Sequence, residues 1–265
     1  MSDAPRVAIV TGAGRGIGAA AVRALAADGY AVLAVDLCHD LPGLPYSLAT
    51  EADLQQVVAS TDAPDRVAAH VADVRDPRQL AAAVATAESR WGGLDVAVGC
   101  AGIIAGGLDQ WEVDSDVERA VVDINLHGIL NLARGTIPAM LRRPAPRSGR
   151  FVAVASAAAT QGLAKLTAYC AAKAGVTGAV RALAAELGAT GITANSVSPG
   201  STRTAILDES ARLYDLDDAE AFAAQQPLCR LIEPEEVAAA IAFLASPRSS
   251  AITGAEVPVD GGFVL

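Results

Sequence analysis

The sequence predicts a doubly wound α/β fold: a single domain built on a seven-stranded, mainly parallel sheet with helices on both faces. Three observations predict it. Short, continuously apolar runs recur along the 265 residues, and alanine-rich segments separate them. The runs lack the apolar–polar alternation of a half-solvated strand, which indicates that both of their faces are buried. Strands that alternate with helices form parallel sheets, and ligands bind at the carboxyl ends of such strands.

The expected elements follow from these runs in order. Gly29 and Gly188 each end a helical segment, and Thr50 is the expected N-cap of a helix that has Asp53 at its third position. Strands are expected at 6–12, 30–36, 66–74, 94–102, 149–156, 192–200 and 256–262, and helices at 17–29, 50–60, 115–141 and 169–188. We take the whole chain, 1–265, as one domain.

Composition excludes several classes of function. The net charge of −10 disfavours binding to nucleic acid and to anionic membrane surfaces. The longest uncharged apolar run, 96–108, is too short and too glycine-rich to cross a bilayer, and the amino terminus does not resemble a signal peptide. The cysteines lack the spacing of a metal site and are expected to be reduced thiols in a cytoplasmic protein; they are Cys38, Cys100, Cys170 and Cys229.

The segment TGAGRGIG at 11–18 lies directly between the first expected strand and the first expected helix. Gly12, Gly16 and Gly18 permit a tight turn and the close approach of backbone to a pyrophosphate, and the helix N-terminus supplies free N–H donors. In this strand–turn–helix context the pattern predicts the dinucleotide turn of a Rossmann fold; the alternative is a purely structural glycine turn.

An acidic residue at the end of the second strand bears on the choice of dinucleotide. Asp36 follows Gly18 by 18 residues, where a carboxylate can accept hydrogen bonds from the adenosine ribose and repel a 2′-phosphate. Arg15 favours the opposite choice, because an arginine beside this turn can pair with that phosphate. We give Asp36 more weight because its position faces the ribose, so NAD is expected rather than NADP.

From here the chain resembles the short-chain dehydrogenase/reductase family, in its compact single-domain branch. The resemblance runs from Thr11 to Gly262. It rests on the order and spacing of TGAGRGIG, ADV at 72–74, INLHG at 124–128, Ser156, YCAAK at 169–173, SPG at 198–200 and VDGG at 259–262. It implies hydride transfer between a nicotinamide cofactor and a secondary alcohol or ketone.

The candidate catalytic residues are Asn125, Ser156, Tyr169 and Lys173. Tyr169 and Lys173 are four residues apart on one expected helix and so share a face. A nearby ammonium and an oxidised nicotinamide should favour the phenolate, which makes Tyr169 the general acid/base. Ser156 ends the fifth strand, where it can hydrogen-bond the substrate oxygen. The resemblance implies that Asn125 holds a water linking Lys173 to solvent, and that Lys173 also binds the nicotinamide ribose.

Further cofactor contacts are implied by the family motifs. They are Ile17, Leu37, Asp73, Val74, Cys100, Ala101, Gly102, Pro199, Gly200, Thr202 and Thr204, in addition to Gly12, Arg15, Gly16, Gly18, Asp36, Tyr169 and Lys173. One departure occurs after the fourth strand, where the family usually has Asn-Asn-Ala-Gly and this chain has Gly99-Cys100-Ala101-Gly102. The asparagine that ties neighbouring strands is lost, and Cys100 is interpreted as a packed small residue.

The connection between the second and third strands is longer than it needs to be. Asp36 and Arg66 are separated by 29 residues, whereas a crossover with its helix needs about a dozen. Residues 37–49 are therefore surplus, and their leucines and Tyr46 make them too apolar for a solvated linker. They leave the sheet beside the expected adenosine, where a flap would cover the cofactor. The alternatives are a loop that packs on its own helix and a subunit contact.

This insertion resembles that of the mycofactocin-associated subgroup of the family, which shares a VD-x-C-x(n)-PY-x-LAT-x-x-DL pattern. The resemblance implies that NAD does not exchange and that reducing equivalents leave through mycofactocin. Two alternatives stay open: an ordinary family member with freely exchanging NAD(P), and a non-catalytic NAD-binding sensor, which would be expected to lack part of the Tyr/Lys/Ser set.

The segment 201–233 is expected to form a helical lid over the substrate. Its apolar residues favour a hydrophobic alcohol or ketone over a sugar or a hydroxy acid; they are Ile206, Leu207, Leu213, Tyr214, Leu216 and Phe222. His39 and His127 are interpreted as structural or surface residues, since the tyrosine supplies the acid/base group. The small residues of the helix 169–188 can pack against a second copy, and the family resemblance implies a homotetramer.

Overall fold

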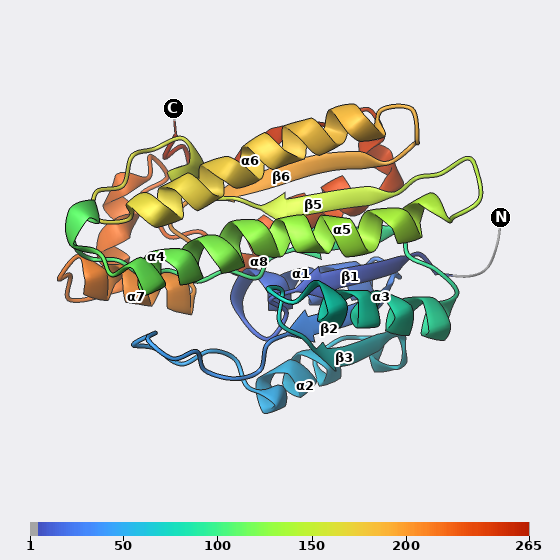
Figure 1. Cartoon of the computed structure of the whole chain (residues 1–265), viewed down its shortest axis with the longest axis horizontal. Helices are drawn as coiled ribbons and strands as arrows, with labels where there is room; N and C mark the ends of the chain where they lie inside the picture. Colours follow the sequence, from blue (N-terminus) through green and yellow to red (C-terminus); the bar gives the residue numbers. More distant parts are fainter. Residues whose placement is uncertain (1–4, 265) are drawn as a thin grey trace.

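The computed structural model describes residues 5–264 and contains one sheet of seven strands (Figure 1). Their order across the sheet is β3-β2-β1-β4-β5-β6-β7, and every neighbouring pair is parallel. The strands are β1 (Val7–Thr11), β2 (Ala31–Asp36), β3 (Val67–Val71), β4 (Val96–Gly99), β5 (Arg150–Val154), β6 (Thr193–Pro199) and β7 (Glu256–Val259). The predicted doubly wound fold is confirmed, and each expected strand lies where its apolar run is.

Residues 5–264 contain eight α-helices, most of which pack on the two faces of this sheet (Figure 1). They are α1 (Gly16–Ala27), α2 (Glu51–Ala59), α3 (Pro77–Trp91), α4 (Ser115–Val122), α5 (Gly128–Leu141), α6 (Thr167–Leu187), α7 (Ala205–Leu213) and α8 (Pro234–Ala245). Helices α1 and α8 pack together on one face, and α3, α5 and α6 cover the other. None of the helices in this part of the chain has the length and apolarity that crossing a bilayer requires.

The period of the strands explains why there are two separate cores. Successive side chains of a strand point to opposite faces, so Ile9 packs against the face of α3, α5 and α6, and Val10 against the face of α1 and α8. Both are almost completely buried. A sheet that is covered on both faces therefore requires strands that are apolar along their whole length.

Two helices, α3 and α8, were not among the expected elements. Each begins with a proline at its first position, after the caps Asp76 and Glu233 respectively. These are ordinary helix start signals, and buried large apolar residues recur at helical spacing in both segments, Leu80 and Val84 in α3 and Val237, Ile241 and Leu244 in α8. Usable signals for both helices were therefore present in the sequence.

The expected helix 115–141 is interrupted by a π-helical turn, Asp123–His127, between α4 and α5. In this turn the Asn125 side chain donates through Nδ2 to the carbonyls of Val121 and Ile103, at 2.9 Å each. The i−4 carbonyl of Val121 therefore bonds to a side chain, and the wider turn directs Asn125 towards the loop that follows β4. Single π turns of this kind occur frequently at functional sites.

Helix α2 begins as the sequence predicts. The Thr50 hydroxyl accepts from the backbone N–H of Asp53, and the Asp53 carboxylate accepts from the backbone N–H of Thr50. This capping box satisfies two N–H groups that a helix terminus otherwise leaves free. It also fixes the point at which the insertion 37–49 rejoins the fold.

Replacing the cap should destabilise the protein measurably. Thr50→Ala removes the hydroxyl acceptor and is expected to lower the free energy of unfolding by about 1 kcal/mol, measured by equilibrium urea denaturation. Thr50→Ser keeps the acceptor and serves as the control. Equal stability of Thr50→Ala and wild type would show that the capping box does not hold this end of α2.

Candidate active site

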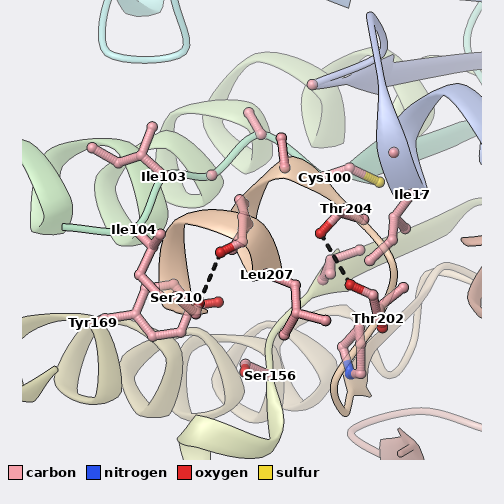
Figure 2. A pocket seen from close by; sticks show the side chains of 18 of the residues that line it. Ile17, Cys100, Ile103, Ile104, Ser156, Tyr169, Thr202, Thr204, Leu207 and Ser210 are labelled. Carbon is pink, nitrogen blue, oxygen red and sulfur yellow. Dashed lines mark hydrogen bonds between the residues drawn. The ribbon is translucent and has the colours of Figure 1, made fainter. Parts of the chain in front are cut away.

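One cavity of about 470 Å³ opens at the carboxyl edge of the sheet. The ends of β1, β2, β4, β5 and β6 all contribute to its wall, as expected for a ligand site in a doubly wound fold. Figure 2 shows Ile17, Cys100, Thr202 and Thr204 on one side, and Ile103, Ile104 and Tyr169 on the other. Every predicted cofactor residue lines this cavity, as does Ser156. Asn125 is fully buried behind the wall, where its Nδ2 donates to the carbonyl of Ile103 and a Cβ at Gly102 would lie 2.8 Å from its Oδ1.

The glycine-rich turn has the geometry that a pyrophosphate requires. Gly12 and Gly16 have φ angles of 68° and 55°, which side chains disfavour. A Cβ at Gly12 would lie 2.6 Å from the backbone of Ala101, and one at Gly18 would lie 1.9 Å from the Gly12 carbonyl oxygen. Only glycine permits this approach of α1 to β1 and β4, which leaves the N-terminus of α1 facing the cavity. The residues present therefore fit a dinucleotide.

Asp36 and Arg15 both line the cavity, where the sequence places the adenosine. The Asp36 carboxylate accepts from the backbone N–H of Gly14 at 2.8 Å and from that of Leu37 at 2.7 Å. Arg15 is directed elsewhere: it donates to the carbonyl of Ser47 at 2.7 Å, and its guanidinium carbon lies 5.9 Å from the centroid of the Tyr46 ring. The structure thus connects Arg15 to the insertion, a partner that sequence reasoning did not identify.

The departure at residues 99–102 has a packing explanation. A Cβ at Gly99 would lie 2.4 Å from Cδ1 of Ile129, so Ile129 fills the space beside this glycine. The two strands remain tied through the backbone, because the N–H of Cys100 donates to the carbonyl of Thr11 at 3.1 Å. Burial raises the pKa of Cys100 to about 12, which keeps the thiol protonated and agrees with a packing role.

Tyr169 and Lys173 lie on the buried face of α6, 8% and 4% exposed. The Lys173 ammonium donates to the carbonyl of Val154 at 3.0 Å and lies 5.7 Å from the centroid of the Tyr169 ring. Burial raises the pKa of Tyr169 to about 12, with a smaller opposing effect of Ser156. Burial also lowers the pKa of Lys173 to about 8.

These directions describe the protein chain alone, in which desolvation raises the pKa of Tyr169. The expectation from the sequence concerns the ammonium together with an oxidised nicotinamide, whose ring would add a positive charge that favours the phenolate.

Asn125 provides an unpaired acceptor close to the lysine. Among residues 5–264 its buried Oδ1 has no hydrogen-bond donor. A Cβ at Gly102 would lie 2.8 Å from this oxygen and 3.6 Å from the Lys173 Nζ, so the missing side chain leaves a gap between the two polar groups. A small polar group in this gap would satisfy both.

The segment after β6 closes the far side of the cavity. The hydroxyl of Thr202 donates to the Gly200 carbonyl at 3.0 Å. The hydroxyl of Thr204 donates to the Thr202 carbonyl at 3.2 Å (Figure 2). A Cβ at Gly16 would lie 3.1 Å from the Thr204 side chain, so this segment touches the glycine-rich turn. Pro199 begins the segment at the end of β6.

The remaining wall is mostly apolar. From the segment 201–233 it takes Ile206, Leu207, Tyr214, Leu216 and Phe222, whereas Leu213 packs into the core. Sequence reasoning missed the other apolar wall residues, Ile103, Ile104, Leu163, Leu166 and Phe263. The first two continue the apolar run of β4, which was a usable signal. The other three lie in loops and in the carboxy-terminal segment, without a period that would distinguish them.

The insertion 37–49 lies along the same cavity and is the blue loop that joins β2 to α2 in Figure 1. Leu41, Leu48 and Ala49 line the cavity, and Asp40 accepts from the backbone N–H of Leu48 at 2.7 Å, which draws the two ends of the insertion together. Near its tip, the Tyr46 hydroxyl hydrogen-bonds to the backbone of Ile104. The insertion therefore contacts both the glycine-rich turn and the loop after β4.

Known proteins resemble this chain over nearly its whole length. A family model described as enoyl-(acyl carrier protein) reductase, of the short-chain alcohol dehydrogenase type, matches residues 12–264. Cis-4-hydroxycyclohexanecarboxylate dehydrogenase of Sinomonas cyclohexanicum is 38% identical, covering 98% of this chain and 97% of that protein. An uncharacterised oxidoreductase of Mycobacterium tuberculosis is 35% identical, covering 100% and 99%.

Solved structures agree with the sequence comparison. Carveol dehydrogenase from Mycobacterium avium, in complex with NAD, superimposes with a TM-score of 0.92 at 30% identity, covering 99% of this chain and 98% of that one. The chain belongs to the short-chain dehydrogenase/reductase family of oxidoreductases.

Proposed function

We propose that this protein is an NAD-dependent oxidoreductase that interconverts an apolar secondary alcohol and its ketone while holding NAD without exchange. The observation that carries the proposal is that Tyr169, Lys173 and Ser156 line the same cavity as a complete dinucleotide turn. A bound nicotinamide would accept or donate the hydride at the substrate carbon. A non-catalytic sensor has no use for these three side chains in this arrangement.

The residues of this chain supply the proton chemistry. The Ser156 hydroxyl lies at the end of β5 and can donate to the substrate oxygen, which orients the reacting carbon. Tyr169 exchanges a proton with the same oxygen. Lys173 places a positive charge beside the phenol, and the free Oδ1 of Asn125 offers the next acceptor along a path for that proton.

NAD rather than NADP follows from the charge beside the ribose position. Asp36 is held there by two backbone N–H groups, where its carboxylate opposes a 2′-phosphate. Arg15 is engaged with Ser47 and Tyr46 of the insertion, which leaves the carboxylate as the dominant charge. The NAD complex of carveol dehydrogenase supports the same choice.

The substrate half of the cavity favours an apolar molecule. The charged residues of the wall are Arg15, Asp36, Asp73 and Lys173, all assigned to the cofactor or to proton transfer. A carboxylate substrate, such as the relative from Sinomonas is named for, would find no unassigned cation here. The apolar part of 201–233 therefore acts as a lid for a hydrophobic alcohol or ketone.

Retention of NAD is supported by the contacts of the insertion on both sides of the cleft. A cofactor that does not leave needs a second redox partner, and mycofactocin is the acceptor that the resemblance of the insertion suggests. The competing proposal is an ordinary enzyme of the family in which NAD exchanges freely. The insertion favours retention, because Leu41, Leu48 and Ala49 line the cavity and Tyr46 bonds to the loop after β4.

Exposed apolar side chains and the cysteines bear on the assembly and the location of the protein. The exposed apolar side chains of Leu130 and Leu141 on α5 and of Phe243 on α8 would be covered by subunit contacts, which supports a homotetramer. The four cysteines are unpaired, which supports a cytoplasmic protein.

Tyr169→Phe should abolish turnover without displacing the cofactor. Loss of the phenolic proton donor is expected to reduce kcat for an apolar secondary alcohol by about a hundredfold to ten-thousandfold, assayed with an artificial electron acceptor. The NAD content per chain should match that of wild type. Tyr30→Phe is the control, because its hydroxyl bonds to the Ala245 carbonyl at the opposite end of β2. Full activity in Tyr169→Phe would contradict the assigned chemistry.

Retention is tested by purifying the protein without added nucleotide, denaturing it and measuring the NAD released. We expect about one NAD per chain after gel filtration, and turnover that depends on an artificial acceptor but not on added NAD. Protein that is free of NAD yet turns over with added NAD would refute retention and leave the ordinary dehydrogenase.

A further inference from the structure

The hydroxyl of Tyr46 bonds twice to a single residue far along the chain. It donates to the Ile104 carbonyl at 3.2 Å and accepts from the Ile104 N–H at 3.0 Å. Within residues 5–264, these are the hydrogen bonds that the backbone of Ile104 makes. The loop after β4 has left the sheet, so within the described part of the chain Ile104 has no neighbouring strand to bond with. The Tyr46 hydroxyl of the insertion supplies the hydrogen-bond donor and acceptor instead.

Ile104 belongs to the wall of the substrate half of the cavity. It is 3% exposed, and Figure 2 shows its side chain beside Tyr169. The preceding residue, Ile103, has a different partner, because its carbonyl accepts from Nδ2 of Asn125 at 2.9 Å. Two adjacent residues of this loop therefore have two different anchors, one in the insertion and one in the π turn.

The surroundings of Tyr46 keep its hydroxyl able to donate. Burial raises the pKa of Tyr46, which opposes ionisation. Arg15 and the Ile104 bond act in the opposite direction, and Glu209 of α7 acts with burial. Arg15 also packs over the ring, so the side chain is fixed between the glycine-rich turn and the loop after β4.

We propose that Tyr46 is a positioning residue that fastens the insertion to the substrate wall, so that one contact both closes the cofactor cleft and holds Ile103 and Ile104 in register with Asn125. The proposal rests on the proposed function and adds a coupling to it: opening of the insertion loosens the substrate site. A flap that merely covered the adenosine would have no contact with residue 104.

The test compares wild type, Tyr46→Phe and Ser47→Ala. Tyr46→Phe keeps the ring and removes both hydrogen bonds, while Ser47→Ala changes an exposed neighbour whose backbone carbonyl still binds Arg15. The release of NADH is measured after the bound cofactor has been reduced by an alcohol substrate. The KM and kcat of that substrate are measured with an artificial acceptor.

For Tyr46→Phe we expect NADH release about ten- to a hundredfold faster, the effect of losing two hydrogen bonds of ordinary strength. KM should rise several-fold, with a smaller change in kcat because Tyr169, Lys173 and Ser156 are intact. Ser47→Ala should match wild type in all three quantities. Faster release with unchanged KM would overturn the coupling, and unchanged release would overturn the fastening.

The experiment distinguishes a failure of this inference from a failure of the proposed function. If wild type already exchanges NAD freely, retention fails, yet the ratio of release rates between Tyr46→Phe and wild type still decides whether Tyr46 fastens the insertion. Amide hydrogen exchange provides a second measurement on the same proteins. The N–H of Ile104 should be protected in wild type and exchange at least tenfold faster in Tyr46→Phe; equal exchange would show that the contact does not persist in solution.

Discussion

The burial of one positive charge is the constraint on which the centre of this molecule depends. The Lys173 ammonium is almost completely removed from water, and a charge in such a place is unfavourable unless polar groups replace its hydration. The replacements come from separate parts of the chain: the Val154 carbonyl at the end of β5 and the Tyr169 ring on α6. The lowered pKa of Lys173 shows that they compensate the desolvation only in part.

Because the desolvation of Lys173 is only partly compensated, two irregular features near it can be explained. The π turn interrupts a long helix so that Asn125 can bond to Ile103 and still leave its oxygen free. Gly102 keeps the space between that oxygen and the ammonium open. A larger residue at 102 would fill this gap, through which the proton passes in the function we propose.

The sequence predicted the strands and the site residues because both leave local signals. Apolar runs mark the buried strands, and the glycine-rich turn and the Tyr–Lys spacing have fixed separations along the chain. We did not predict α3 and α8, although the proline starts and the apolar spacing of both segments were available signals. The π turn could not be predicted, because it depends on the tertiary bond from Asn125 to Ile103. Nor could the sequence give the direction of the Tyr169 pKa shift, since desolvation depends on how closely the folded chain surrounds the phenol. The partners of Arg15 and Tyr46 were also hidden, because these contacts join segments that are distant in sequence.

Two separate segments of the chain lie over the cavity, and this arrangement decides which molecules can exchange in the proposed reaction cycle. The insertion 37–49 lies over the cofactor half and bonds to Ile104, while α7 and the residues after it cover the substrate half. Their separate attachments allow the segment 201–233 to move without breaking the bonds of Tyr46. A substrate can then enter and a product leave while the insertion stays closed. If NAD is retained as we propose, substrate exchange is compatible with that retention, and the oxidant that regenerates the cofactor would use the substrate's entrance.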